Sequence, residues 1–146
     1  KAAGFGVTAV TRTSSKAELA RQLGADNVVS DGAELKAAGG ADVIMHTSSS
    51  HAAVVNAMDG LRPWGKVVMN GIAVDEMTLP ALPLVSHSYQ IAGSAHNGPE
   101  YLAEALELVA SGAVKPMIEV FPKGRVADAY ERAASGAVRF KAVVTY

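Results

Sequence analysis

The sequence predicts a fold of the α/β class, a doubly wound parallel sheet that carries helices on both faces. Short runs rich in Val and Ile alternate along the chain with amphipathic helical stretches, which is the pattern of βαβ units. Strands of such a sheet are buried and read as short apolar runs. The chain has 146 residues, the length of one domain, and this is enough to bury a sizeable core.

The positions of the elements follow from this pattern and from the residues that end each element. Strands are expected over residues 5–11, 27–29, 41–47, 66–72, 89–94, 117–122 and 140–146. Helices are expected over residues 15–23, 31–38, from the serines at 48–50 to 61, 99–111 and 125–134. Ser15 and Glu18 match a capping box, and Gly24, Gly112 and Gly136 are placed to end helices. Prolines break segment 78–85 too often for a long helix.

The composition argues against several classes of function. The formal net charge is −1, so no basic excess favours nucleic acid binding. No apolar run approaches the roughly 20 residues of a membrane span, and the first residues do not have the pattern of a signal peptide. The absence of cysteine excludes disulfides and thiolate metal sites within the chain and fits a reducing compartment. We expect a cytoplasmic protein that binds neither nucleic acid nor membrane.

The four histidines do not predict a metal site. His46 and His51 are separated by a strand-to-helix junction, and His87 and His96 flank a strand. Neither pair has the i, i+4 spacing that places two ligands on one helix face, and no acidic motif accompanies them. We therefore expect no metal-binding residues in this chain.

The turn after the first expected strand is rich in hydroxyl groups and cations. In a doubly wound nucleotide-binding fold, the end of the second strand meets the adenosine ribose, where an acid would repel a 2′-phosphate. Here no acid appears before Glu18, so the hydroxyls, the two cations and the helix N-terminus form an anion receptor. The predicted contacts are Thr11, Arg12, Thr13, Ser14 and Lys16. The alternative is a solvated helix start in which Ser and Thr only cap.

Two further strands end in residues suited to contact a ligand, because ligands of open α/β sheets lie beyond the carboxyl ends of the strands. Thr47 and Ser48 follow one strand, with an ordinary cluster of helix caps as the alternative. Asn70, Gly71 and Ile72 end the next, where Gly71 allows a close approach of the backbone. The alternative there is a tight Asn-Gly turn.

The order of these elements resembles the C-terminal half of the medium-chain dehydrogenase/reductase family, the zinc-dependent alcohol dehydrogenases in particular. The matching phrases occur in the family order and span nearly the whole chain, and they lie at residues 17–26, 40–44, 61–68, 91–94, 104–108 and 129–132. The chain departs from the family in lacking Gly-x-Gly-x-x-Gly and the catalytic zinc ligands. We therefore expect a fragment of such an enzyme, whose central strand would be missing from the sheet.

The resemblance implies a Rossmann-type sheet that lacks its first strand and glycine-rich loop in this chain. Residues 1–112 would form part of an NAD(P)-binding domain, and residues 113–146 would return to the catalytic, GroES-like domain. It adds Ser94 at the nicotinamide carboxamide and Lys141 at the pyrophosphate as cofactor contacts. It also implies a homo-oligomer through strand 89–94. No catalytic residue is expected here, and zinc is expected only in the absent N-terminal half.

The implied function is the cofactor-binding part of an alcohol dehydrogenase that prefers NADP, with NAD possible, and acts on a small alcohol or carbonyl compound. The fragment alone is expected to be inactive. Two alternatives remain open: a zinc-free quinone or enoyl reductase of the same family, and a non-enzymatic module that senses a dinucleotide. The sequence upstream would separate them through the presence or absence of zinc ligands.

Overall fold

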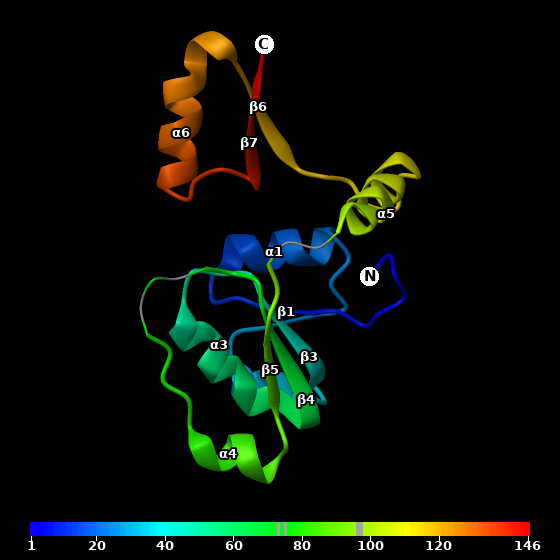
Figure 1. The fold of residues 1–146 in the computed structure, drawn as a ribbon, viewed down its shortest axis with the longest axis vertical. Coiled ribbons are helices and arrows are strands. Elements are labelled where there is room, and N and C mark those ends of the chain that lie inside the picture. The colour runs from blue at the N-terminus through cyan, green and yellow to red at the C-terminus, as the bar shows by residue number, and fades with distance from the viewer. Residues whose placement is uncertain (73, 75, 96–97) are drawn as a thin grey trace. The chain divides into compact units, whose positions relative to one another are not determined.

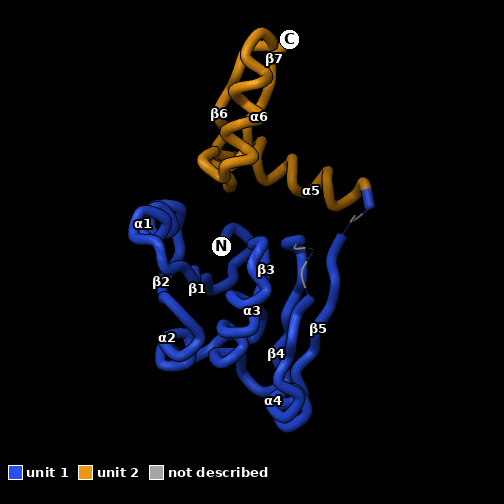
Figure 2. Tube along the Cα trace, turned by 90° about the vertical axis from the view of Figure 1, so that its left-hand side faces the viewer, with its two compact units in different colours: residues 1–98 blue, residues 99–146 orange. Residues whose placement is uncertain are grey.

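The computed structural model describes residues 1–72, 74, 76–95 and 98–146. The chain divides into two compact units, residues 1–98 and 99–146, which Figure 2 shows in different colours. The expected α/β class is confirmed, because the ladders between described strands are parallel and helices connect the strands (Figure 1). In the part of the chain that the structure describes, no helix is long and apolar enough to cross a membrane.

The first unit begins with a two-stranded parallel sheet. Strand β1 (Thr8–Val10) pairs with β2 (Asn27–Val29), and helix α1 (Ser14–Gln22) connects them. The side chain of Asp26 accepts a hydrogen bond from the backbone amide of Val7 at 2.8 Å and also pairs with the ammonium of Lys1. These hydrogen bonds from Lys1 and Val7 lower the pKa of Asp26.

A second, three-stranded parallel sheet completes the first unit. Its strands are β3 (Ala41–His46), β4 (Leu61–Met69) and β5 (Gln90–Gly93), in that order across the sheet. The connecting helices are α2 (Gly32–Ala37), α3 (His51–Ala57), the 3₁₀ turn η1 (Met58–Gly60) and α4 (Ala81–Ser86). Helix α2 contacts both β1 and β4, so it joins the two sheets.

The core of the first unit lies on one face of this three-stranded sheet. Val54 and Met58 pack there against Leu61 and Val67, and Val67 is only 1% exposed. Glycines allow α2 to lie close to α3 and η1. A Cβ on Gly32 would lie 2.0 Å from the carbonyl oxygen of Asn56, and one on Gly60 would meet the side chain of Leu35 at 2.6 Å.

The opposite face of the three-stranded sheet is open. Val43 and Met45 alternate along β3 with the core-facing residues and are 55% and 65% exposed. In Figure 2 the strands follow one another across the unit in the order β2, β1, β3, β4, β5, yet no ladder joins β1 to β3 among the described residues. The sheet is therefore split at one position, as expected of a doubly wound sheet without its first strand.

The capping box predicted at Ser15 and Glu18 is wrong. Helix α1 begins at Ser14, and its N-cap Thr13 makes no capping hydrogen bond with its side chain. By contrast, the predicted serine cap of α3 is confirmed, since the Ser50 hydroxyl accepts from the amide of Ala53 at 3.3 Å. The turn expected at residues 62–65 lies inside β4, where the register with β3 shifts. Trp64 has a φ of 64° in this turn.

The second unit consists of a helix followed by a βαβ unit. Its elements are α5 (Pro99–Ala110), β6 (Ile118–Pro122), the 3₁₀ turn η2 (Lys123–Arg125), α6 (Val126–Ala134) and β7 (Lys141–Thr145). Strand β6 pairs with β7, and Phe121 and Ala129 are buried. The Arg132 guanidinium donates to both carboxylate oxygens of Glu119, which lowers the pKa of Glu119.

Candidate functional site

The carboxyl ends of β3, β4 and β5 are tied together by backbone hydrogen bonds. The carbonyl of His46 accepts from the amides of Asn70 and Gly71, at 3.0 and 2.6 Å. The amide of Ser94 donates to the carbonyl of Met69 at 2.9 Å. Three of the predicted contact stretches therefore meet at one edge of the sheet, where ligands of open α/β folds lie.

The close packing at this edge depends on Gly71. A Cβ built on Gly71 would lie 2.0 Å from the carbonyl oxygen of Ser48, so only glycine fits against this loop. The predicted residues Thr47 and Ser48 are thereby held beside Asn70 and Gly71. Ile72 follows with 85% of its surface exposed, which leaves it free to contact a ligand. The edge presents mostly backbone and small polar side chains.

The serines after β3 have separate roles. The Ser48 hydroxyl accepts from the amide of Ser50 at 3.2 Å, and Ser50 caps α3. Helix capping thus accounts for the Ser50 side chain and does not involve Thr47. The Ser48 hydroxyl accepts one hydrogen bond and can still donate its proton to a ligand. The two interpretations of this serine cluster, cap or ligand contact, are compatible in the structure.

His46 is the buried polar residue of this edge, and the sequence predicts no functional role for it. It is 4% exposed, and its Nε2 has no hydrogen-bond partner among the described residues. Its Nδ1 lies 3.5 Å from the Ser48 hydroxyl, and its ring centroid is 6.3 Å from that of His51. The signal that could have found it is the period-two alternation of β3, which places His46 on the same face as Ile44.

The predicted anion receptor lies at the carboxyl end of β1. The Thr11 amide donates to the Val29 carbonyl at 2.9 Å, and the Thr11 hydroxyl accepts from the Thr13 amide at 3.3 Å. Arg12 and Lys16 are exposed, and neither is in an ion pair within the described part of the chain. The first turn of α1 contains no acidic residue. The turn therefore offers two available cations, hydroxyl groups and a helix N-terminus without a side-chain cap.

One predicted contact residue belongs to the other unit. Lys141 begins β7 in the second unit, so its contact with the cofactor stays a prediction. Among residues 1–72, 74, 76–95 and 98–146, no group of three or more His, Asp or Glu side chains could hold a metal ion. His96, one of the four histidines that do not predict a metal site, lies outside the described residues.

We predict that Gly71→Ala destabilises the protein. The added Cβ would collide with the Ser48 backbone, so one loop must move, at a cost of about 1–3 kcal/mol. Urea unfolding measures the loss, and amide chemical shifts of Ser48 and Asn70 should report the displacement. Gly93→Ala is the matched control, because a Cβ there meets nothing within 4 Å. Equal effects of the two substitutions would contradict the assigned role of Gly71.

The burial of His46 predicts that the stability of the protein depends on pH. Burial, and secondarily the charge of His51, lower the pKa of His46 below the ordinary value of 6.5. As the pH falls through that ordinary value, the unfolded chain binds a proton that the folded chain excludes. The free energy of unfolding should therefore decrease between about pH 7.5 and about pH 5.5.

Urea unfolding across this pH range measures the effect. His46→Gln should flatten the pH dependence, whereas His87→Gln, at an exposed position, should leave it unchanged. A slope that His46→Gln does not alter would show that other groups cause the pH dependence.

Comparison with known proteins shows the family of this chain. A model of the zinc-binding dehydrogenase family matches residues 1–111. An alcohol dehydrogenase of Geobacillus stearothermophilus is 34% identical over 99% of this chain and 44% of its own length. A probable formaldehyde dehydrogenase of Bacillus subtilis is 34% identical over 98% of this chain and 42% of its own. The chain thus spans less than half the length of these curated relatives.

Solved structures of alcohol dehydrogenases are also similar to this chain. The chain superimposes on a cinnamyl alcohol dehydrogenase of Sorghum bicolor with a TM-score of 0.84 and 28% identity, over 97% of this chain and 41% of that one. An alcohol dehydrogenase of Aeropyrum pernix gives a TM-score of 0.84 and 26% identity, over 97% and 43%. The parallel sheets, the family match and the similar solved structures lead to one conclusion: this chain belongs to the zinc-binding dehydrogenase family, within the medium-chain dehydrogenases of the zinc-type alcohol dehydrogenase group.

Proposed function

We propose that this chain is the cofactor-binding part of a zinc-type alcohol dehydrogenase that prefers NADP(H). The observation that carries the proposal is the turn after β1. There Arg12 and Lys16 are exposed and form no ion pair with a described residue, and no acid stands in the first turn of α1. An acid at this place would accept from the ribose hydroxyls and repel a 2′-phosphate. Two cations and hydroxyl donors favour the phosphate instead.

The dinucleotide would extend from this turn along the carboxyl edge of the strands. The Arg12 guanidinium and the Lys16 ammonium would bind the 2′-phosphate, supported by the hydroxyls of Thr11, Thr13 and Ser14. The nicotinamide end would lie against the loops after β3, β4 and β5. Its contacts there would be Thr47, Ser48, Asn70, Gly71, Ile72 and Ser94.

The residues of this edge fit a flat, polar cofactor. Gly71 presents no side chain at the point of closest packing, so a ligand could approach the backbone there. When bound, the nicotinamide supplies hydride transfer, and the chain's own groups supply position and charge. We assign Lys141 to the pyrophosphate and residues 113–146 to the segment that returns to the catalytic domain.

Zinc has no fitting donor set among the described residues, because no three candidate ligands cluster. The zinc ligands of the complete enzyme would lie in the N-terminal half, where zinc would bind a small alcohol or carbonyl oxygen. The printed names of the relatives include alcohol, formaldehyde and cinnamyl alcohol dehydrogenases. We also place the enzyme in the cytoplasm, and we propose a homo-oligomer that pairs strand 89–94 of two copies.

The adenosine end is tested by adenosine 2′,5′-bisphosphate against AMP, which differ only in the 2′-phosphate. The chain should bind the bisphosphate more tightly, and Arg12→Asp should reduce that preference about tenfold to hundredfold, the value of a charge-assisted hydrogen bond. Calorimetric titration at low salt measures both affinities. Arg21→Asp is the control, since Arg21 lies at the far end of α1, 3.8 Å from Glu18. A preference that Arg12→Asp leaves intact would refute the phosphate receptor.

The isolated chain should not catalyse hydride transfer, because its described residues hold no zinc-ligand cluster and it spans less than half the length of its relatives. Absorbance at 340 nm in the presence of NADP, zinc and benzyl alcohol should not rise above the rate without protein. Formation of NADPH that depends on both protein and alcohol would contradict this assignment. The same assay on a protein that includes the upstream half is the positive control.

A further inference from the structure

The imidazole of His46 touches the candidate site through one of its two ring nitrogens. Its Nδ1 lies 3.5 Å from the Ser48 hydroxyl, which makes a long hydrogen bond. Its Nε2 is buried and has no hydrogen-bond partner among the described residues. Burial, and secondarily the charge of His51 on α3, lower the pKa of His46 below 6.5, so the ring is neutral at pH 8.

The surroundings of this ring bear on which nitrogen carries the proton. A neutral imidazole has one N–H donor and one acceptor nitrogen. With the proton on Nε2, an N–H group would be buried without an acceptor, and such groups are rarer in proteins than buried acceptors without a donor. With the proton on Nδ1, the N–H donates to the Ser48 hydroxyl. The structure therefore favours the proton on Nδ1.

This tautomer leaves the Ser48 hydroxyl only its proton to offer. A hydroxyl group has two acceptor positions and one proton. The Ser50 amide, at 3.2 Å, uses one acceptor position, and the Nδ1–H of His46 uses the other. No acceptor takes the proton within the described part of the chain, and Ser48 is exposed at the carboxyl edge of the sheet. The hydroxyl can therefore donate to a ligand at this edge.

We propose that His46 is a positioning residue for the nicotinamide end of the cofactor: its Nδ1–H fixes the Ser48 hydroxyl as a hydrogen-bond donor to a ribose or carboxamide oxygen. The proposal rests on the proposed function, in which the nicotinamide half lies against this loop. Gly71 packs against the Ser48 carbonyl, so the main chain is already held there. Fixing the hydroxyl before the ligand binds lowers the entropy cost of binding.

The tautomer is measurable in the unchanged chain, without any substitution. The nitrogen chemical shifts of the His46 ring at pH 8 should show a protonated Nδ1 and an unprotonated Nε2. The reverse assignment would overturn the proposal, because the Ser48 proton would then be used by Nδ1.

Two substitutions separate the roles of the two ring nitrogens. The amide nitrogen of Asn lies near the place of Nδ1 and can donate to Ser48, whereas the amide of Gln reaches the place of Nε2. His46→Asn should therefore keep the NADPH affinity within about twofold of the original, and His46→Gln should lower it about three- to tenfold, the value of one neutral hydrogen bond. Calorimetric titration at pH 8 measures both, and circular dichroism verifies the fold.

A double-mutant cycle shows whether His46 acts through Ser48. Ser48→Ala should lower the NADPH affinity by the same factor as His46→Gln, and the double variant should lower it no further. The affinity for adenosine 2′,5′-bisphosphate, which lacks the nicotinamide half, should be the same in all variants.

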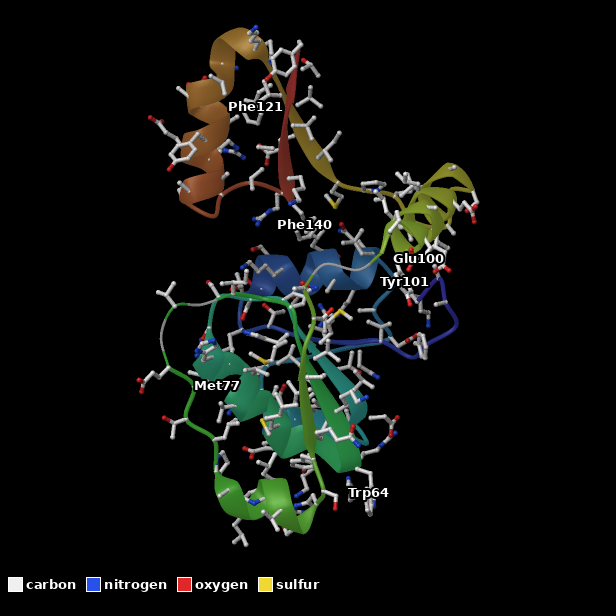
Figure 3. The ribbon with its side chains drawn as sticks, in the orientation of Figure 1. Trp64, Met77, Glu100, Tyr101, Phe121 and Phe140 are labelled. Atoms are coloured by element: carbon white, nitrogen blue, oxygen red, sulfur yellow. The ribbon has the colours of Figure 1, made fainter. Side chains whose placement is uncertain are left out.

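His87→Gln is the matched control, at an exposed histidine. The carbonyl of His87 accepts from the Trp64 amide at 2.8 Å. Trp64 lies in the first half of β4, at the end of the sheet opposite the candidate site (Figure 3). This substitution should change neither affinity.

Equal losses in His46→Asn and His46→Gln, or losses that add in the double variant, would overturn the proposal, because they indicate a role in packing alone. An NADPH affinity that Ser48→Ala leaves unchanged would also overturn it. The proposed preference for a 2′-phosphate is tested separately by the bisphosphate against AMP. NADPH and the bisphosphate both carry that phosphate, so it cancels when their affinities are compared.

Discussion

The backbone hydrogen bonding of β1 and β3 is the constraint on which the first unit depends. A central strand of a parallel sheet bonds on both sides, yet each of these strands has one neighbour among the described residues. The nucleotide-binding order 3-2-1-4-5-6 maps onto β2, β1, a vacant position, β3, β4 and β5. The vacant position is that of the strand that precedes the glycine-rich loop. The split in the sheet and the absence of a glycine-rich loop therefore have the same cause, because that strand and that loop are adjacent in the family's order.

In the proposed site, this constraint would separate the groups that select the cofactor from the group that would bind its pyrophosphate. The turn at the end of β1 holds its own shape through bonds to β2 and within Thr11–Thr13. The opposite end of the site is held by the His46 carbonyl and by the contact of Gly71 with Ser48. Neither arrangement uses the vacant strand. The pyrophosphate, which would lie between them, has no helix N-terminus following a glycine-rich loop in this chain.

The sequence predicted the strands and most helices well, because Val- and Ile-rich runs and terminal glycines are local signals. The carboxyl ends of parallel strands lie at one edge of a sheet, so the sequence alone predicts that Ser48 and Asn70 share that edge. The positive φ of Trp64 could not be predicted from the sequence. Its turn reads as Pro-Trp-Gly, in which Gly65 would ordinarily take the positive φ. Instead Gly65 packs so closely on Leu61 that a Cβ would lie 2.6 Å from the leucine side chain. The burial of His46 was missed although it was open to prediction, because the period-two alternation of β3 places His46 on the same face as Ile44.

Segment 77–99, which includes no Asp, Glu, Lys or Arg, links the two ends of the three-stranded sheet. It begins beside the core, where Met77 and Leu79 pack, continues through α4 into β5, and passes Ser94 at the candidate site. Because β5 is an edge strand of only four residues, its position rests on β4 on one side and on Tyr89 before its start, whose hydroxyl donates to the Leu61 carbonyl. A contact that fixed the free edge of β5 would also fix Ser94 against Met69. Assembly and the geometry of the nicotinamide end would then depend on the same short strand.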